Sequence, residues 1–289
     1  MVRPLFIIFL LTRVFSYAQS LDPLATPDVD KQTQWVESTY QSLSLDQKIG
    51  QLFMVMAFSE KDSTHTKELI SLVDTYHLGG VIFSKGTPVR QAKLTNTLQE
   101  QSKVPMLIAM DAEWGLAMRL KETFAYPYNM TLGAVANDSL IYQVGARIGA
   151  HAKRLGVHIN FSPVLDINTN PNNPIIGNRS FGEDKNNVAQ KGLAMMKGMQ
   201  SQGILTSAKH FPGHGDTSTD SHKTLPTIGF SADRIEKIEL YPFKKLIKHG
   251  IESVMVAHLE IPALDARNQY PSSLSKAIVN DLLLEKLSF

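Results

Sequence analysis

The sequence contains no cysteine, and this absence excludes several classes of protein at once. A disulfide scaffold, a thiol nucleophile, a cysteine-based zinc site and an acylated lipobox cysteine all require that residue. Net charge is small as well, because 29 basic side chains face 27 acidic ones, which gives +2 at pH 7. A chain this close to neutral has no overall field to attract nucleic acid or an anionic membrane surface, so neither is expected as a partner.

Long hydrophobic runs are also missing. The apolar stretch Leu5–Leu11 is too short to span a bilayer, and no later segment reaches spanning length. The stretch follows a basic residue, Arg3, and precedes small residues at Ser16 and Ala18. This pattern is typical of a secretory signal peptide, here residues 1–18, and a buried N-terminal strand is the alternative. We therefore predict a secreted or periplasmic protein with no membrane span after cleavage.

Short apolar runs alternate along the chain with amphipathic segments. Hydrophobic residues make up 43% of the chain and charged residues 19%, a balance that excludes wholesale disorder. Six runs are expected as strands: 51–57, 80–84, 105–110, 158–167, 204–208 and 253–257. They are hydrophobic throughout, as strands buried on both faces should be. Their alternation with helices predicts βαβ units and a parallel sheet.

The intervening segments carry helix start and stop signals. One helix is expected to begin at the cap residue Asn137 and to end at Gly156. Four apolar residues share one face of it and are expected to be buried: Leu140, Val144, Ile148 and Leu155. Another helical segment, from Ser231 to Gly250, contains Pro242, which we expect to restart it as a second short helix.

Polar residues follow the ends of successive predicted strands. They are Asp111 after the third, Asp166 after the fourth, Lys209 and His210 after the fifth, and His258 and Glu260 after the sixth. A (β/α)₈ barrel carries its active site on this face. The competing fold is a doubly wound sheet, but no G-x-G-x-x-G turn follows the first strand. We predict the α/β barrel.

The number of strands departs from a complete barrel. Six are counted before the chain stops at Phe289, behind a helical segment at 275–287, whereas a barrel closes with eight. We therefore expect residues 45–289 to form a TIM-type barrel that is truncated after its sixth βα unit. A polar segment, 19–44, separates it from the signal peptide.

Residues 209–222, KHFPGHGDTSTDSH, bring three histidines, two aspartates and a lysine together on a backbone rich in glycine and proline. Lys209, at the end of a strand, can donate hydrogen bonds to a hydroxyl-rich ligand. Asp220 and His222 are two residues apart in an extended loop, so the carboxylate can hold the imidazole. A histidine held in this way can serve as general acid or base near neutral pH. Alternatively, the histidines only cap the loop.

A metal site is a second alternative for this loop. His210, His214 and Asp216 are suitable ligands for zinc or a harder ion. However, the spacing of the two histidines crosses Phe-Pro-Gly and cannot lie on a helix, which is the geometry that this spacing usually indicates. No metal and no other cofactor is predicted.

Candidate ligands also follow the third strand. Asp111 and Glu113 can each accept hydrogen bonds from neighbouring sugar hydroxyls, and Trp114 can pack against the apolar face of a sugar. The alternative is a structural salt bridge to Arg119. In a later loop, Arg179 is interpreted either as a donor that reaches the ligand or as a brace for the loop.

Five segments, in this order, resemble glycoside hydrolase family 3 and in particular its bacterial β-N-acetylglucosaminidases. They are IAMDAEWGLAMRL, NFSPVLDIN, NRSFGED, AKHFPGHGDTSTDSH and VMVAHLEIPALD. The fourth is highly specific, and the resemblance covers residues 45–289. It implies a (β/α)₈ barrel that hydrolyses terminal β-linked N-acetylglucosamine with retention of configuration. Peptidoglycan fragments or chitin oligosaccharides are the implied saccharide substrates.

The resemblance also implies residue roles. Five residues would bind the sugar: Asp111, Arg119, Arg179, Lys209 and His210. His222 would be the general acid/base, held by Asp220. The family often has Glu-Gly-Gly-Arg where this chain has Glu-Trp-Gly-Leu at 113–116, a change that alters the wall of the pocket.

The nucleophile is the position in doubt. In the family it is an aspartate on the seventh strand, in a segment resembling Gly-Leu-Val-Phe-Thr-Asp, and this chain ends at Phe289, where that strand should begin. A retaining mechanism needs an attacking group as well as an acid, so an inactive fragment is expected. The alternatives are a sugar-binding pseudoenzyme and a metal-dependent hydrolase that uses the histidine loop. Phosphorolysis in place of hydrolysis is a variant, because a histidine repels phosphate less than a carboxylate does.

Overall fold

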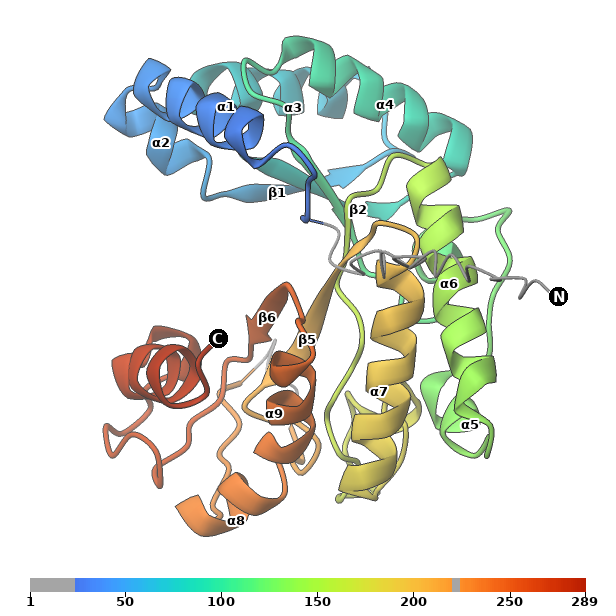
Figure 1. Cartoon of the computed structure of the whole chain (residues 1–289), viewed down its shortest axis with the longest axis vertical. Helices are drawn as coiled ribbons and strands as arrows, with labels where there is room; N and C mark the ends of the chain where they lie inside the picture. Colours follow the sequence, from blue (N-terminus) through green and yellow to red (C-terminus); the bar gives the residue numbers. More distant parts are fainter. Residues whose placement is uncertain (1–23, 220–223) are drawn as a thin grey trace, which may run out of the picture.

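The computed structural model describes residues 24–219 and 224–289 and is built on one sheet of six parallel strands (Figure 1). The strands are β1 (Met54–Phe58), β2 (Gly80–Lys85), β3 (Leu107–Met110), β4 (Ile159–Asn160), β5 (Leu205–Phe211) and β6 (Ser253–Val256). They lie side by side in the order of the sequence. Each of the six predicted apolar runs overlaps one strand, and the predicted parallel α/β sheet is confirmed.

Helices connect the strands and lie on the outside of the curved sheet (Figure 1). Two helices, α1 (Val29–Ser42) and α2 (Leu45–Gly50), precede β1. The crossovers that follow contain α3 (Ser63–Tyr76), α4 (Pro88–Gln101), α5 (Asn129–Gly133) with α6 (Asp138–Arg154), α7 (Lys185–Gln200), and α8 (Ala232–Lys237) with α9 (Leu240–Lys248). A π-helix, η4 (Ala277–Lys286), follows β6. Sequential strands with outer helices are the arrangement of a TIM-type barrel, here with six βα units.

Three of the earlier predictions fall outside the described residues. They are the signal peptide at 1–18 and the two residues of the acid/base pair, Asp220 and His222. In the part of the chain that the structure describes, none of the helices is long and apolar enough to cross a membrane.

The two outer strands are less buried than the sequence predicts. Met56 in β1 is 52% exposed, and all four residues of β6 are only half-buried. Within residues 24–219 and 224–289, β1 pairs only with β2 and β6 only with β5. Strands on the edge of a sheet have one unpaired side, so a uniformly apolar run does not guarantee burial on both faces.

The fourth strand is much shorter than the predicted run at 158–167. Only Ile159 and Asn160 pair with β3 and β5. Pro163 has no N–H to donate to a ladder, and beyond it a single bridge joins Val164 to Lys209. The remainder of the apolar run therefore continues as irregular backbone, which carries Asp166 to the carboxyl end of the sheet.

The helix caps follow the predicted signals. Asn137 caps α6 by accepting a hydrogen bond from the Ser139 N–H at 3.0 Å, and the predicted break in the Ser231–Gly250 segment separates α8 from α9. Of the four residues predicted on the buried face of α6, Ile148 is buried and Val144 and Leu155 pack against the core, but Leu140 is 47% exposed. The buried residues of α6 are Ile141, Gly145, Ile148, Gly149 and Ala152. Two glycines on this face allow α6 to approach α7 closely, and the close approach selects the face.

A glycine of α7 completes this close contact. A Cβ at Gly198 would lie 2.2 Å from the carbonyl oxygen of Tyr142, and one at Gly145 would lie 2.4 Å from that of Met195. Real Cβ atoms do not approach an oxygen so closely, so α6 and α7 would have to separate. Helix α7 packs against β5, so separation of the pair would disturb the strand that carries Lys209 (Figure 1).

We therefore predict that Gly198→Ala destabilises the protein. Alanine favours a helix over glycine by about 1 kcal/mol, but overpacking costs about 1–3 kcal/mol and here meets rigid backbone, so the net effect is a loss. Thermal unfolding measures it. Gly229→Ala is the control, because a Cβ there meets nothing within 4 Å. A higher unfolding temperature for Gly198→Ala than for the wild type would contradict the packing described here.

Candidate functional site

Five of the seven predicted site residues meet at the carboxyl ends of β3 and β5. Asp111 directly follows β3, and Lys209 and His210 belong to β5. Arg119 follows the short 3₁₀ helix η1 (Leu116–Met118), and Arg179 is the last residue of a second, η2 (Gly177–Arg179). The structure thus brings Asp111, Arg119, Arg179, Lys209 and His210 into one network, which we call the charged cluster and which also includes Glu113.

Lys209 is the centre of the charged cluster. Its Nζ lies 2.8 Å from Asp111 Oδ1 and 2.7 Å from Glu113 Oε1, and its side chain is 2% exposed. An ammonium group that is removed from water at this depth needs partners of opposite charge, and two carboxylates supply them. Burial alone would raise the pKa of Glu113, but Lys209 and Arg179 reverse that effect and lower it to about 2.

Each of these carboxylates has an arginine on its other side. Arg119 Nη2 lies 2.6 Å from Asp111 Oδ2, and Arg179 donates to Glu113 from Nε at 3.0 Å and from Nη2 at 2.7 Å. The second contact is bidentate, which fixes the plane of the guanidinium. Burial would raise the pKa of Asp111 too, but Lys209 and Arg119 hold it below its ordinary value. Both carboxylates are therefore ionised at neutral pH.

His210 connects the charged cluster to a second buried acid. Its Nδ1 lies 2.6 Å from Asp166 Oδ2, and Arg179 Nη2 lies 3.3 Å from its Nε2. The guanidinium can only donate, so Nε2 carries a lone pair and Nδ1 carries the proton that it donates to Asp166. Burial lowers the pKa of His210 despite the neighbouring Asp166, in keeping with this neutral tautomer.

Asp166 also holds the start of the histidine loop. Its Oδ1 accepts hydrogen bonds from the backbone N–H groups of His210 at 3.2 Å and His214 at 2.7 Å. Asn173, which is 7% exposed, donates from Nδ2 to the carbonyls of His214 and Gly215. Asp166 therefore acts as a brace for the start of this loop. The loop is anchored by side chains from the segment that follows β4.

The sequence identified Glu113 only as one possible sugar ligand and missed its central position. Glu113 is fully buried and contacts both Lys209 and Arg179. The spacing of the two acids in the sequence could have indicated this position. Asp111 and Glu113 are two residues apart directly after a predicted strand, and alternate side chains of an extended chain share a face. The predicted alternative of a salt bridge between Asp111 and Arg119 is also observed, in the same network.

The three side chains of the metal alternative each have partners other than a metal ion. His210 directs its nitrogens at Asp166 and Arg179, His214 Nδ1 lies 2.7 Å from Thr217 Oγ1, and Asp216 Oδ1 accepts from Thr169. Across the described residues, no group of three or more histidines and acids is arranged to hold a metal ion. The positively charged Arg179 guanidinium beside His210 Nε2 would also repel a metal ion at that nitrogen.

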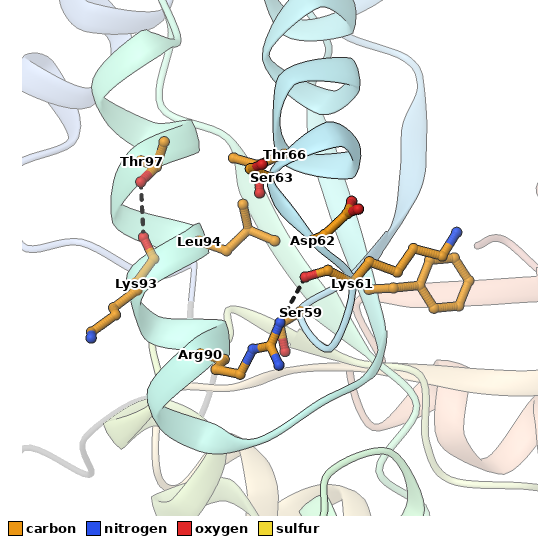
Figure 2. A pocket seen from close by; sticks show the side chains of 10 residues that line it. Ser59, Lys61, Asp62, Ser63, Thr66, Arg90, Lys93, Leu94 and Thr97 are labelled. Carbon is orange, nitrogen blue, oxygen red and sulfur yellow. Dashed lines mark hydrogen bonds between the residues drawn. The ribbon is translucent and has the colours of Figure 1, made fainter.

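A separate surface hollow of about 300 Å³ lies between α3 and α4 (Figure 2). None of the predicted site residues lines it. Figure 2 shows Lys61 and Lys93 directed to opposite sides, while Arg90 donates to the Lys61 carbonyl at 2.7 Å. Because its cations do not face a common point, we assign it no ligand.

Six βα units with hydrogen-bonding charges at the carboxyl ends of the strands define a barrel-type domain with a polar candidate site. Comparison with known proteins identifies its family. Residues 44–289 match the description "Glycosyl hydrolase family 3 N terminal domain". The chain therefore belongs to glycosyl hydrolase family 3.

Individual relatives agree with this assignment. Beta-hexosaminidase A of Pseudoalteromonas piscicida is 35% identical over 250 residues, 78% of this chain and 42% of that protein. A glycoside hydrolase family 3 β-N-acetylglucosaminidase from Paenibacillus sp. str. FPU-7 has a TM-score of 0.80 at 38% identity, covering 86% of this chain and 48% of that one. Beta-glucoside phosphorylase BglX has a TM-score of 0.83 at 28% identity, covering 90% and 48%. The chain thus spans between 42% and 48% of the length of these relatives.

We predict that Glu113→Gln removes stability in a pH-dependent way. The variant removes the anion that Arg179 contacts and one of the two anions that Lys209 contacts, which costs about 3–5 kcal/mol at neutral pH. In the wild type the pKa falls from 4.5 in the unfolded chain to about 2, so the stabilisation by Glu113 is complete above pH 4.5 and is lost as the pH falls toward 2. The variant should lose less stability than the wild type across this interval.

Denaturant unfolding at several pH values between 2 and 7 measures both effects. Glu100→Gln is the matched control, because Glu100 is an exposed residue of α4. If Glu113→Gln and the wild type fall with the same slope on the acid side, Glu113 does not hold the charge that the geometry assigns to it.

Proposed function

We propose that this domain binds the terminal sugar of a β-linked N-acetylglucosamine saccharide and takes part in its hydrolysis. The observation that carries the proposal is the charged cluster around Lys209. A neutral, hydroxyl-rich ring requires several fixed donors and acceptors at one place, and the cluster supplies carboxylate oxygens, guanidinium groups and an imidazole. The names of the family relatives, β-hexosaminidase and β-N-acetylglucosaminidase, support the choice of sugar.

Solvent exposure divides the charged cluster and the neighbouring Asp166 into two layers. The side chains of Asp111, Arg119, Arg179 and His210 are between 16% and 29% exposed. Glu113 and Asp166 are fully buried behind them. In the proposed complex the exposed groups bind sugar hydroxyls, while Glu113 and Asp166 hold Arg179 and His210 in place. Lys209 lies between the layers and fixes Asp111 Oδ1.

The proposed chemistry is retaining hydrolysis. His222, held by Asp220, protonates the departing glycosidic oxygen, and a carboxylate attacks the anomeric carbon from the opposite side of the ring. Water then attacks the anomeric carbon, His222 takes its proton, and the carboxylate leaves as the sugar is released. We propose that the attacking carboxylate is the aspartate that the family carries on its seventh strand. No residue of this sequence matches that position. The contacts of Asp166 and Asn173 support the dyad indirectly, because they fix the loop that leads to Asp220.

The remaining parts of the proposal concern where the domain acts and on what. A signal peptide at 1–18 would take the protein out of the cytoplasm. The proposed substrates outside the cytoplasm are peptidoglycan fragments or chitin oligosaccharides. The fold match to a β-glucoside phosphorylase makes phosphorolysis the second candidate reaction. In that case inorganic phosphate, not water, accepts the sugar.

An aryl glycoside assay tests this proposal. It measures the release of nitrophenol from 4-nitrophenyl β-N-acetylglucosaminide by the protein as its gene encodes it. We expect His222→Ala to lower kcat by about 10²–10⁴-fold, the usual contribution of a general acid/base. His249→Ala, at an exposed histidine at the C-terminus of α9, should leave the rate unchanged. Added phosphate that yields a sugar 1-phosphate would favour the phosphorylase.

Three outcomes would contradict the proposal. Full activity of His222→Ala would exclude the dyad, and loss of activity with a chelator would favour a metal-dependent hydrolase. A wild-type protein that binds N-acetylglucosamine but releases no nitrophenol would instead be the sugar-binding pseudoenzyme.

A further inference from the structure

Four aromatic residues lie on the segment that follows Glu113 and leads into α5. Trp114 and Tyr128 form an edge-to-face pair with ring centroids 4.8 Å apart, and Phe124 and Tyr126 form another at 4.8 Å. Tyr128 is 47% exposed and Trp114 is half-buried. Neither ring belongs to the charged cluster, and the proposed sugar-binding role does not use them.

The Trp114–Tyr128 pair is attached to the charged cluster at both ends. Trp114 directly follows Glu113, whose carboxylate holds Arg179 and Lys209. Tyr128 directly precedes Asn129, which is 2% exposed and donates from Nδ2 to the Arg179 carbonyl at 2.7 Å. The two rings are therefore carried by the immediate chain neighbours of residues that fix Arg179.

The backbone around the pair is also fixed. Tyr126 donates its N–H to the Trp114 carbonyl at 3.0 Å, which ties the two parts of the segment together. Gly115, next to Trp114, has φ +91°, and a Cβ there would lie 2.9 Å from the Tyr126 ring. Glycine is thus required at 115, and the backbone of Trp114 is held on an ordered turn directly after Glu113.

From this arrangement we infer that Trp114 and Tyr128 form an aromatic platform for the second sugar of a saccharide whose terminal sugar occupies the charged cluster. The inference rests on the proposed function. The C–H faces of a pyranose ring pack on aromatic rings, and the indole N–H and phenol O–H can bond its hydroxyls. Two rings that already contact each other offer a surface area far below the roughly 800 Å² that each partner buries in a stable protein interface. A single sugar is the occupant that fits this area.

The test is calorimetric titration with N-acetylglucosamine and with its β-1,4-linked disaccharide, using the full protein in a His222→Ala background to prevent turnover. With the platform intact, the disaccharide should bind about tenfold more tightly than the monosaccharide, a difference of roughly 1.4 kcal/mol. Trp114→Ala should remove this difference and leave the monosaccharide affinity unchanged. Trp114→Phe should retain part of it, because a ring remains.

Phe124→Ala is the matched control, since Phe124 is 65% exposed on the same segment and packs on Tyr126 instead of Trp114. It should leave the affinity ratio unchanged. Equal affinities in the parent protein, or a loss of both affinities in Trp114→Ala, would overturn the platform and leave the proposed function standing. If neither saccharide binds the parent protein, the proposed function fails and the platform fails with it.

Discussion

A buried ammonium group, that of Lys209, is the constraint from which the rest of the site follows. An isolated cation at 2% exposure is too costly to retain, so Asp111 and Glu113 must be ionised and within contact distance. Each carboxylate also accepts hydrogen bonds from an arginine. The result is a network that joins the ends of β3 and β5 to the η2 turn. Its geometry is set within the protein, and such preorganisation would lower the cost of binding the proposed sugar.

The second buried acid extends this constraint to the histidine loop. Asp166 fixes the His210 ring and the His214 backbone together, so the first part of the loop is attached to the same framework as Arg179. The neutral state of His210 follows from the same contacts, since Arg179 can approach Nε2 only while that nitrogen has a lone pair. His210 is therefore held as a neutral imidazole between Asp166 and Arg179.

The sequence predicted the fold well where one physical rule dominates. Apolar runs of strand length between capped helices specified six parallel strands, and polar residues at their ends placed Asp111, Lys209 and His210 in one site. It failed where tertiary contacts decide. Leu140 has the right helical spacing but lies outside the face that the close approach of α6 and α7 selects. The apolar run around β4 loses its regular pairing near Pro163, and the central role of Glu113 depends on Arg179, 66 residues away in the chain.

The central claim is that the charged cluster is the place where the sugar binds, and a crystal structure with N-acetylglucosamine tests it most directly. The account predicts one ring over the ends of β3 and β5, with its hydroxyls within hydrogen-bond distance of Asp111, Arg119 and His210. Glu113 and Asp166 should keep their present partners beneath it. A sugar bound elsewhere, with the cluster closed on itself and untouched, would contradict the account.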